Sequence, residues 1–556
     1  MRIYRSGEIS IPTDQNLTEL LHSSAHPDLP ESHLIAKDNL TNRSITIGRL
    51  RERAGRIATG LQLKLKPADQ ARWAIILPNS VEFLELVHAI LWTGGVVCPI
   101  NHALKASEIG HGLSVARPDF IVSYGPTVPA VQEALKIAGN YLADQGVSWK
   151  KPEVVSIISR APGHRHVPDD FFASERLPVP HYPNTRTRLA TIHLSSGTTG
   201  NPKGVELTHY NFIANCYQLF ARDPKAFHPS SRCVAFTPWT HIANTTMPLF
   251  LGPWTGMLHH AMPTYNFEEY VKLVGSNRAT TFQGVPSVVL QLANSDATSR
   301  YDFSQAQVVN VGGVLKKELR QRFLSKAPWK LNQVYGMTEA AGYVAYQSID
   351  ERLPDDVTGS LLPNIEACLK KEGSTEDAPE GGPGELWIRG PNITRGYAFN
   401  DEANKKAFPI SGWYNTGDVC TVDKEGIISV VGRTKDLIKY KGFQVSPTEL
   451  EGYLNTHPQV IEGGVGATWD ESQLTELPTA WVILKDHFKT VEQRKQALKE
   501  IHQAVDKEVS GYKKLRGGVW QIKSLPKNPT GKILRKQLVE MKDGLCSLDD
   551  TPRAKL

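Results

Sequence analysis

Short apolar segments alternate with helical patterns over much of the chain, and this alternation limits the folds that are open to it. The stretch 72–101 predicts a strand, a helix and a second strand. The stretch 279–294 predicts a strand followed by a helix that Pro286 opens, and 307–324 repeats the same plan. Strands that alternate with helices favour an α/β fold with largely parallel sheets, which bind ligands at the carboxyl ends of their strands. Candidate sites are therefore expected in the loops that follow the strands.

The loop within 193–209 follows one predicted strand and combines hydroxyls, glycines and a single lysine. Glycine lets the backbone approach a ligand closely, and lysine adds a positive point charge. A flexible linker has a similar composition, but this loop lies between a strand predicted at 190–196 and a strand and helix predicted at 204–220, which favours a ligand site. Because Gly-Lys-Ser/Thr and GxGxxG are both absent from it, we expect a polyphosphate loop of another kind. The candidate residues are Ser195, Ser196, Gly197, Thr198, Thr199, Gly200 and Lys203.

The size and charge of the chain exclude several classes of protein. With 556 residues, several domains are expected rather than one core. The 63 cations and 57 anions form no block of like charge, so we expect no nucleic-acid partner. The most apolar run, 83–100, contains Glu85, His88 and two glycines, and no transmembrane segment is expected there. The six cysteines show neither a CxxC pair nor zinc spacing, which favours reduced and mostly buried thiols.

Four further motifs follow the loop along the chain: YGMTE at 335–339, YNTGD at 414–418, GRTKDLIKYKGFQV at 432–445 and PKNPTGK at 526–532. Together with SSGTTGNPKG they resemble the acyl-adenylate-forming superfamily of acyl-CoA synthetases, peptide-synthetase adenylation domains and beetle luciferases. The closest resemblance is to 4-coumarate–CoA ligase-like acyl-CoA ligases. It implies an N-terminal domain of α/β subdomains at 1–433 that binds ATP and the acyl group. A small mobile α+β domain at 434–556 would carry a catalytic lysine.

The implied reaction overcomes the poor leaving ability of a carboxylic acid's hydroxyl group. Attack of the carboxylate on the ATP α-phosphate gives an acyl-AMP and pyrophosphate, and AMP then leaves when a thiolate attacks. Negative charge gathers on the phosphoryl oxygens, where one fixed donor contributes on the order of 10²–10³ in rate. The resemblance therefore implies an ATP-dependent carboxylate–CoA ligase that uses ATP, Mg²⁺ and coenzyme A and acts on an aromatic or medium-chain acid.

The resemblance also implies a role for each residue of the nucleotide site. Thr338 would contact the phosphoryl group, and the hard oxygens of Glu339 would help to hold magnesium. Tyr335, next to Gly336, would lie at the adenine edge. Asp418 would accept both ribose hydroxyls in one bidentate contact. Arg433 would touch the ribose or phosphate side.

Lys532 would reach the site from the C-terminal domain and bind both the carboxylate and the α-phosphate. His241, in PWTHIANTT, matches a family position near the acyl carboxylate, and a purely structural histidine is the alternative. In NVGGVLKKEL the proline of the family's GAAPL-like segment is missing and one residue fewer is present. The residues assigned to the acyl pocket are His241, Asn244, Gly312, Gly313 and Val314.

One site has to exclude water during adenylation and then admit the thiol, so Lys532 must leave between the two steps. Hinges are usually a few residues at the ends of elements, and we place this one at Lys435 and Asp436. Rotation would bring Lys439 and Gly442 to the pantetheine tunnel of coenzyme A. A solvated β-turn is the alternative for that segment.

Three other functions compete with the ligase. The acyl-AMP could pass to a separate carrier protein or an amine, or a luciferase-like oxidation could follow. A catalytically dead nucleotide-binding or scaffold protein is the third option. Retention of Lys203, Glu339, Asp418 and Lys532 argues against that last option.

The chain's last three residues, Ala554, Lys555 and Leu556, are similar to the Ser-Lys-Leu peroxisomal address. We therefore expect the peroxisomal import receptor as a partner and the peroxisome as the location, with the cytoplasm as the alternative.

Overall fold

The computed structural model describes residues 1–195, 202–310, 315, 317–326, 330–354, 357–434, 436–441, 443–528, 531–542 and 544–548. Within these residues the largest sheet has fourteen strands, which divide into a parallel part and an antiparallel part. Their order is β1 (Tyr4–Arg5), β18 (Glu366–Lys370), β19 (Gly384–Arg389), β21 (Tyr414–Val422), β22 (Ile427–Arg433), β17 (Gly359–Leu361), β16 (Ala345–Tyr346), β15 (Lys330–Tyr335), β14 (Gln307–Asn310), β13 (Thr281–Gln283), β11 (Arg232–Ala235), β12 (Leu258–Ala261), β2 (Leu34–Asp38) and β3 (Ser44–Thr46). The strands from β15 to β2 pair in parallel, and those from β15 to β1 pair antiparallel.

A second sheet of eight strands carries the glycine-rich loop. Its order is β20 (Gly396–Tyr397), β10 (Lys203–Thr208), β9 (Leu189–Ser195), β5 (Val96–Pro99), β4 (Arg72–Ile76), β6 (Phe120–Tyr124), β7 (Glu153–Ile157) and β8 (His166–Val167). From β9 to β8 the pairing is parallel. The principal helices of this larger body are α1 (Leu17–His22), α2 (Ile47–Leu65), α3 (Val81–Trp92), α4 (Ala106–Ala116), α5 (Val128–Asp144), α6 (His209–Arg222), α9 (Phe267–Ser276), α10 (Pro286–Asn294), α11 (Lys317–Leu324) and α12 (Asp401–Ala407). The α/β prediction is confirmed, as are the strands and helices predicted within 72–101, 204–220 and 279–294.

Helix α3 shows why the most apolar run of the chain is a core helix. Ser80 accepts a 3.2 Å hydrogen bond from the Phe83 N–H and so caps the helix, and every residue from Val81 to Trp92 is buried. Its buried carboxylates, Glu82 and Glu85, each lie 2.7 Å from a guanidinium nitrogen of Arg43. Buried charges require such partners. In the described part of the chain, no helix is both long and apolar enough to cross a membrane.

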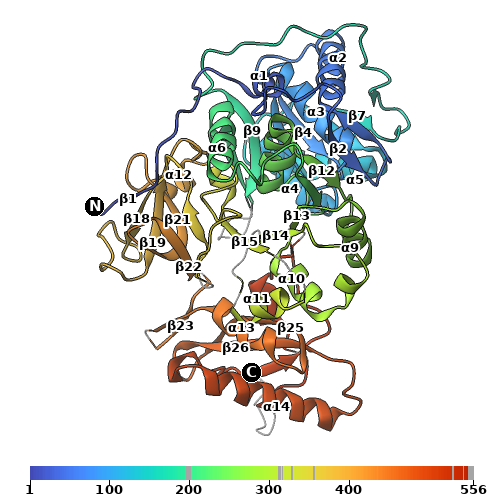
Figure 1. Ribbon diagram of the computed structural model, residues 1–556. Helices are drawn as coiled ribbons and strands as arrows, with labels where there is room; N and C mark the ends of the chain where they lie inside the picture. Colours follow the sequence, from blue (N-terminus) through green and yellow to red (C-terminus); the bar gives the residue numbers. More distant parts are fainter. Residues whose placement is uncertain are drawn as a thin grey trace.

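The C-terminal elements have their own sheets and their own core. Strands β23 (Ile438–Tyr440) and β24 (Phe443–Val445) form a hairpin, and β25 (Val460–Asp470), β26 (Thr475–Leu484) and β27 (Val519–Gln521) form a second sheet. Helices α13 (Pro447–Thr456), α14 (Val491–Glu508) and α15 (Arg535–Glu540) accompany these strands, with a core that includes Leu450, Val482 and Leu498. Figure 1 shows these elements in orange and red, gathered below α10 and α11. Strand β22 of the large sheet ends at Arg433, next to the domain boundary that we predict.

The start of α13 is held by tertiary contacts. Ser446 is the N-cap and Pro447 opens the helix, but no reciprocal capping bonds form between Ser446 and Glu449. The Ser446 hydroxyl instead donates to the Val431 carbonyl at 3.0 Å, and Glu449 forms a 2.8 Å ion pair with Lys513. Tertiary partners therefore replace the local cap. All six cysteines are buried as free thiols, in line with the interpretation of their spacing.

Candidate active site

A cavity of about 1510 Å³ lies beyond the ends of β9 and β15 and is closed on one side by the C-terminal domain. Many of the predicted site residues line this one space, although they come from distant parts of the chain. They are Ser195, Lys203, His241, Gly336, Thr338, Glu339, Asp418, Arg433 and Lys532. Both domains thus supply polar groups to one cavity.

Several predicted residues lie outside the described residues. These are Ser196, Gly197, Thr198, Thr199, Gly200, Gly312, Gly313, Val314, Lys435 and Gly442, together with the terminal Ala554, Lys555 and Leu556. Their assignments stay predictions.

The Glu339 carboxylate is held by two hydroxyl groups. It lies in a 3₁₀ turn, Thr338–Ala340, directly after β15. Ser195 at the end of β9 donates to Glu339 Oε1 at 2.8 Å, and Tyr397 donates to the same oxygen at 3.0 Å. The Tyr397 hydroxyl also lies 3.1 Å from that of Tyr414. Within the described chain both bonds fall on Oε1, so Oε2 is open to a further partner.

Lys203 lies directly opposite Ser195 in the register of β9 and β10. Its Nζ lies 4.9 Å from the centroid of the Tyr397 ring, a cation–π contact. Among the described residues no carboxylate forms an ion pair with it. Lys203 therefore brings a positive charge to the cavity that Glu339 also lines.

Glycine is required where the chain turns at the end of β15. A Cβ atom on Gly336 would lie 1.8 Å from the Gly342 carbonyl oxygen, which no side chain allows. The return path includes Ala341 with φ of 51° and Gly342 with φ of 120°. Close backbone contact thus folds 335–343 into the loop that presents Thr338 and Glu339.

Asp418 is buried and engaged on both carboxylate oxygens. Tyr335 donates to Oδ2 at 2.6 Å, and Arg433 Nε donates to Oδ1 at 2.9 Å. Asp418 and Arg433 face each other in the register of β21 and β22. The Asp418 carboxylate raises the pKa of Arg433, and burial raises the pKa of Tyr335. Each oxygen of Asp418 keeps a second lone pair, so a diol can still bind there.

Lys532 enters the cavity from the loop between β27 and α15. Its N–H donates to Asn528 Oδ1 at 2.9 Å, and the Asn528 N–H donates to the Lys532 carbonyl at 2.9 Å, which fixes the backbone. The pKa of Lys532 is lowered to about 8, chiefly by burial and also by the nearby Arg433, while Asp436 and Asp418 oppose the shift. Asp436 is the hinge residue that the structure describes. It lies close to Lys532 but does not line the cavity.

His241 precedes α7 (Ile242–Asn244) and lines the cavity, and burial lowers its pKa to about 4. It is therefore neutral near pH 7. Asn244 lies behind the wall, where its amide donates to the Thr237 carbonyl at 3.1 Å and accepts from Gln283. It supports the pocket wall and does not line it.

The cavity has an apolar end that sequence analysis did not locate. Most of its side chains come from the start of α10, from α11 and from the segment around α7. They are Val285, Pro286, Leu290, Leu319, Val334, Ile242, Ala243, Met337 and Tyr343. Tyr397 and Tyr414 were also missed, although Tyr414 begins the YNTGD motif and could have been tested as a donor.

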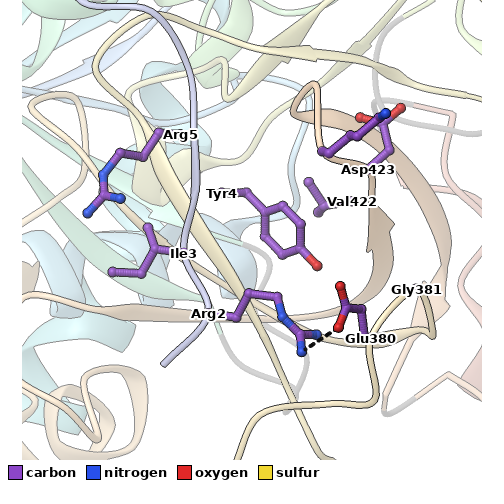
Figure 2. A pocket seen from close by; sticks show the side chains of 9 residues that line it. Arg2, Ile3, Tyr4, Arg5, Glu380, Gly381, Val422 and Asp423 are labelled. Carbon is purple, nitrogen blue, oxygen red and sulfur yellow. Dashed lines mark hydrogen bonds and ion pairs between the residues drawn. The ribbon is translucent and has the colours of Figure 1, made fainter.

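A second cavity of about 530 Å³ lies between the N-terminus and the antiparallel part of the large sheet (Figure 2). It is lined by Arg2, Ile3, Tyr4, Arg5, Glu380, Gly381, Val422, Asp423 and Lys424. Arg2 forms a 3.2 Å ion pair with Glu380, and Arg5 forms one of 2.9 Å with Glu366. No predicted site residue lines it, so the larger cavity is the candidate active site.

Comparison with known proteins matches almost the whole chain. The AMP-binding enzyme family model matches residues 24–398, and that of the AMP-binding enzyme C-terminal domain matches 449–532. The 4-coumarate–CoA ligase-like 9 of Arabidopsis thaliana is 31% identical over 563 residues, covering 97% of this chain and 94% of the relative. Peroxisomal OPC-8:0-CoA ligase 1, also from Arabidopsis thaliana, is 30% identical, covering 84% of this chain and 83% of the relative.

Two solved structures share the fold. An anthranilate CoA ligase in complex with anthranoyl-AMP superposes with a TM-score of 0.83 at 20% identity, covering 95% of this chain and 98% of that one. An amide bond synthetase from Marinactinospora thermotolerans gives a TM-score of 0.77 at 20% identity, covering 94% and 98%. At this level of identity the likeness shows a common architecture of a large N-terminal domain and a C-terminal domain.

Proposed function

The chain belongs to the AMP-binding enzyme family, and from this premise we propose that it is an ATP-dependent carboxylate–CoA ligase for an aromatic or medium-chain acid. It is an enzyme whose relatives are named as CoA ligases. The observation that carries the proposal is the meeting of Lys203 and Glu339 from one domain with Lys532 from the other in a single cavity. Two lysine ammonium groups and a glutamate carboxylate beside an apolar end suit a nucleoside triphosphate bound next to a carboxylic acid.

In the adenylation step the charged groups act on the phosphates. Lys203 and Lys532 stabilise negative charge that develops on the phosphoryl oxygens, and Thr338 contributes a hydroxyl donor. Asp418 accepts from the ribose hydroxyls with its free lone pairs, while Tyr335 and Arg433 keep its carboxylate in place. The C-terminal domain covers the cavity and limits the entry of water.

The site fits a magnesium ion bound with the nucleotide. Magnesium is usually held by one or two carboxylates together with phosphate oxygens and water. Glu339 has one carboxylate oxygen engaged and one open within the described chain, which suits this role. In the same part of the chain no three His, Cys, Asp or Glu side chains form a metal cluster, so the phosphates would complete the coordination. Bound there, the ion would supply positive charge to the phosphates.

The apolar end of the cavity is proposed to take the body of the acid. None of the described side chains there is charged, and His241 beside it is neutral near pH 7. Among the described side chains of this wall, a second carboxylate on the substrate would therefore meet no cation. An aromatic ring or a medium-length alkyl chain fits such a surface.

For the second step we propose that the C-terminal domain turns about Lys435 and Asp436, withdraws Lys532 and brings Lys439 and Gly442 to coenzyme A. The second candidate is transfer of the acyl group to an amine or a separate carrier protein. The amide bond synthetase named above has the same architecture at 20% identity.

The proposed location is the peroxisome, through an import receptor that binds Ala554, Lys555 and Leu556. One relative bears the word peroxisomal in its name. A copy tagged at its N-terminus and ending at Arg553 should lose the import that the tagged full-length chain shows.

The experiment that tests the activity uses the purified full-length chain and a panel of acids. Acid-dependent ATP–pyrophosphate exchange is expected with aromatic or medium-chain acids, and thioester should form when coenzyme A is added. Exchange without thioester would favour the second candidate. Absence of exchange with every acid would contradict the proposed function.

A further inference from the structure

The turn between β18 and β19, residues 371–383, belongs to the large domain and is held by several polar contacts. At its base the buried Lys370 ammonium donates to the Thr375 carbonyl at 2.9 Å and to Asp377 Oδ1 at 2.7 Å. The start of the chain supports it from the side. The Arg2 N–H donates to Asp377 Oδ2 at 2.7 Å, and the Arg2 guanidinium pairs with Glu380 (Figure 2). The turn is therefore held in one position on the large domain.

This turn makes an ionic contact with the C-terminal domain. Glu372 Oε1 lies 3.5 Å from Nζ of Lys439 on β23. Lys439 is itself fixed within its domain, because its N–H donates to Glu476 Oε2 at 2.6 Å and its carbonyl accepts from Thr475 at 3.0 Å. Each partner is thus anchored to its own domain, and the ion pair spans the interface between the two domains.

A second contact supports the same arrangement of the domains. The Arg322 guanidinium on α11 donates to the Asn455 carbonyl on α13 at 3.2 Å. In this arrangement Lys532 lines the cavity together with Lys203 and Glu339. The Glu372–Lys439 pair therefore forms in the same arrangement that places Lys532 at the proposed site of adenylation.

We infer that Glu372 is a positioning residue, which holds the C-terminal domain in the adenylating arrangement by pairing with Lys439. The inference rests on the proposed function, in which Lys439 serves the second step. Lys439 cannot pair with Glu372 and reach the thiol tunnel at once, so the pair has to break as the domain turns. The Lys439 side chain is 63% exposed and that of Glu372 is 37% exposed, so water and salt weaken the pair. Pairs of this kind shift an equilibrium by about 1.5- to 5-fold, enough to bias two arrangements without locking either.

The test measures the arrangement of the domains directly. Cysteines for two fluorescent dyes replace the exposed Lys136 on α5 and Glu492 on α14, since the native cysteines are buried. In low salt and without substrates, Glu372→Gln should lower the ratio of the adenylating arrangement to the other arrangements by about 1.5- to 5-fold, and Glu372→Lys should lower it more. Added salt should produce the same shift in the wild type.

The matched control is Glu376→Gln, because Glu376 lies in the same turn but pairs with Lys371. It should leave the distance distribution unchanged. The double variant with Glu372→Lys and Lys439→Glu should restore the wild-type distribution. An unchanged distribution in Glu372→Lys at low salt would overturn the inference. Because this readout needs no substrate, it is separate from acid-dependent ATP–pyrophosphate exchange, whose absence would refute the proposed function alone.

Discussion

Ser195 and Glu339 lie 144 positions apart in the chain, yet the Ser195 hydroxyl donates a 2.8 Å hydrogen bond to Glu339 Oε1. The bond joins the end of β9, where the glycine-rich loop begins, to the turn that follows β15. It links the two segments to which sequence motifs assign phosphate and metal binding. Displacing one segment would therefore displace the other.

Glu339→Gln should lower acid-dependent ATP–pyrophosphate exchange on the order of 10²- to 10³-fold. Glutamine keeps an oxygen that accepts from Ser195 and Tyr397, so the fold should survive, but the charge that attracts magnesium is lost. The measurement is the exchange rate across a magnesium titration, with circular dichroism to verify folding. The matched control is Glu402→Gln on α12, an exposed carboxylate paired with Lys406, which should retain the wild-type rate. Equal losses of exchange activity in both variants would contradict the assignment of magnesium binding to Glu339.

Lys532 should give adenylation a basic limb in its pH profile. The ammonium is the useful form, and its pKa is about 8, so kcat/KM for ATP should be flat near pH 7 and decline above pH 8. Lys532→Arg keeps its charge and should remove the limb, while Lys532→Ala should suppress acyl-AMP formation but spare thioester formation from supplied acyl-AMP. Lys536→Ala on the exposed side of α15 is the control. A limb that persists in Lys532→Arg would assign the titration to another group.

The same pKa has a consequence for stability. The folded pKa of Lys532 lies below its usual 10.5, so the unfolded chain binds more protons between these values and stability should rise with pH across that interval. Lys532→Ala should therefore not lower the midpoint of urea unfolding at pH 7. A marked loss would mean that the lysine has a structural role.

The strand and helix pattern was predictable because each element has a local cause. Pro286 opens α10, and the strands of the parallel regions are short apolar runs bounded by turns. The motif residues that line the cavity were predictable as individual candidates. Their pairing was not, since Tyr397 and Glu339 meet across 58 positions and Asp418 faces Arg433 across an irregular ladder. The position of Asn244 was not predictable either. Its neighbours in sequence suggest that it lines the pocket, but the hydrogen bond from Gln283 holds it behind the pocket wall.

Asp418→Asn should weaken ATP binding and also reduce stability. Asparagine removes the charge that pairs with the Arg433 guanidinium and weakens the acceptor for Tyr335 and the ribose hydroxyls. Because Arg433 is partly exposed, water compensates in part, and the loss in free energy of unfolding should be about 1 kcal/mol. Urea unfolding and the KM for ATP are the two measurements. Glu425→Gln, in an exposed turn, should change neither.

Leu290→Ala should change which acids are used without affecting the ATP site. Leu290 and Leu292 on α10 are both buried in the same core, but Leu290 also lines the apolar end of the cavity and Leu292 does not. Removing the contact of Leu290 with the acid should reduce kcat/KM for the best substrate by about 10- to 200-fold and shift the preference toward bulkier acids. Leu292→Ala is the matched control: it should lower the free energy of unfolding through a cavity in the core, yet leave the order of preferred acids unchanged. The measurement is a panel of aromatic and alkyl acids at saturating ATP. If Leu290→Ala preserved the wild-type order of preference, the acid would have to bind elsewhere in the cavity.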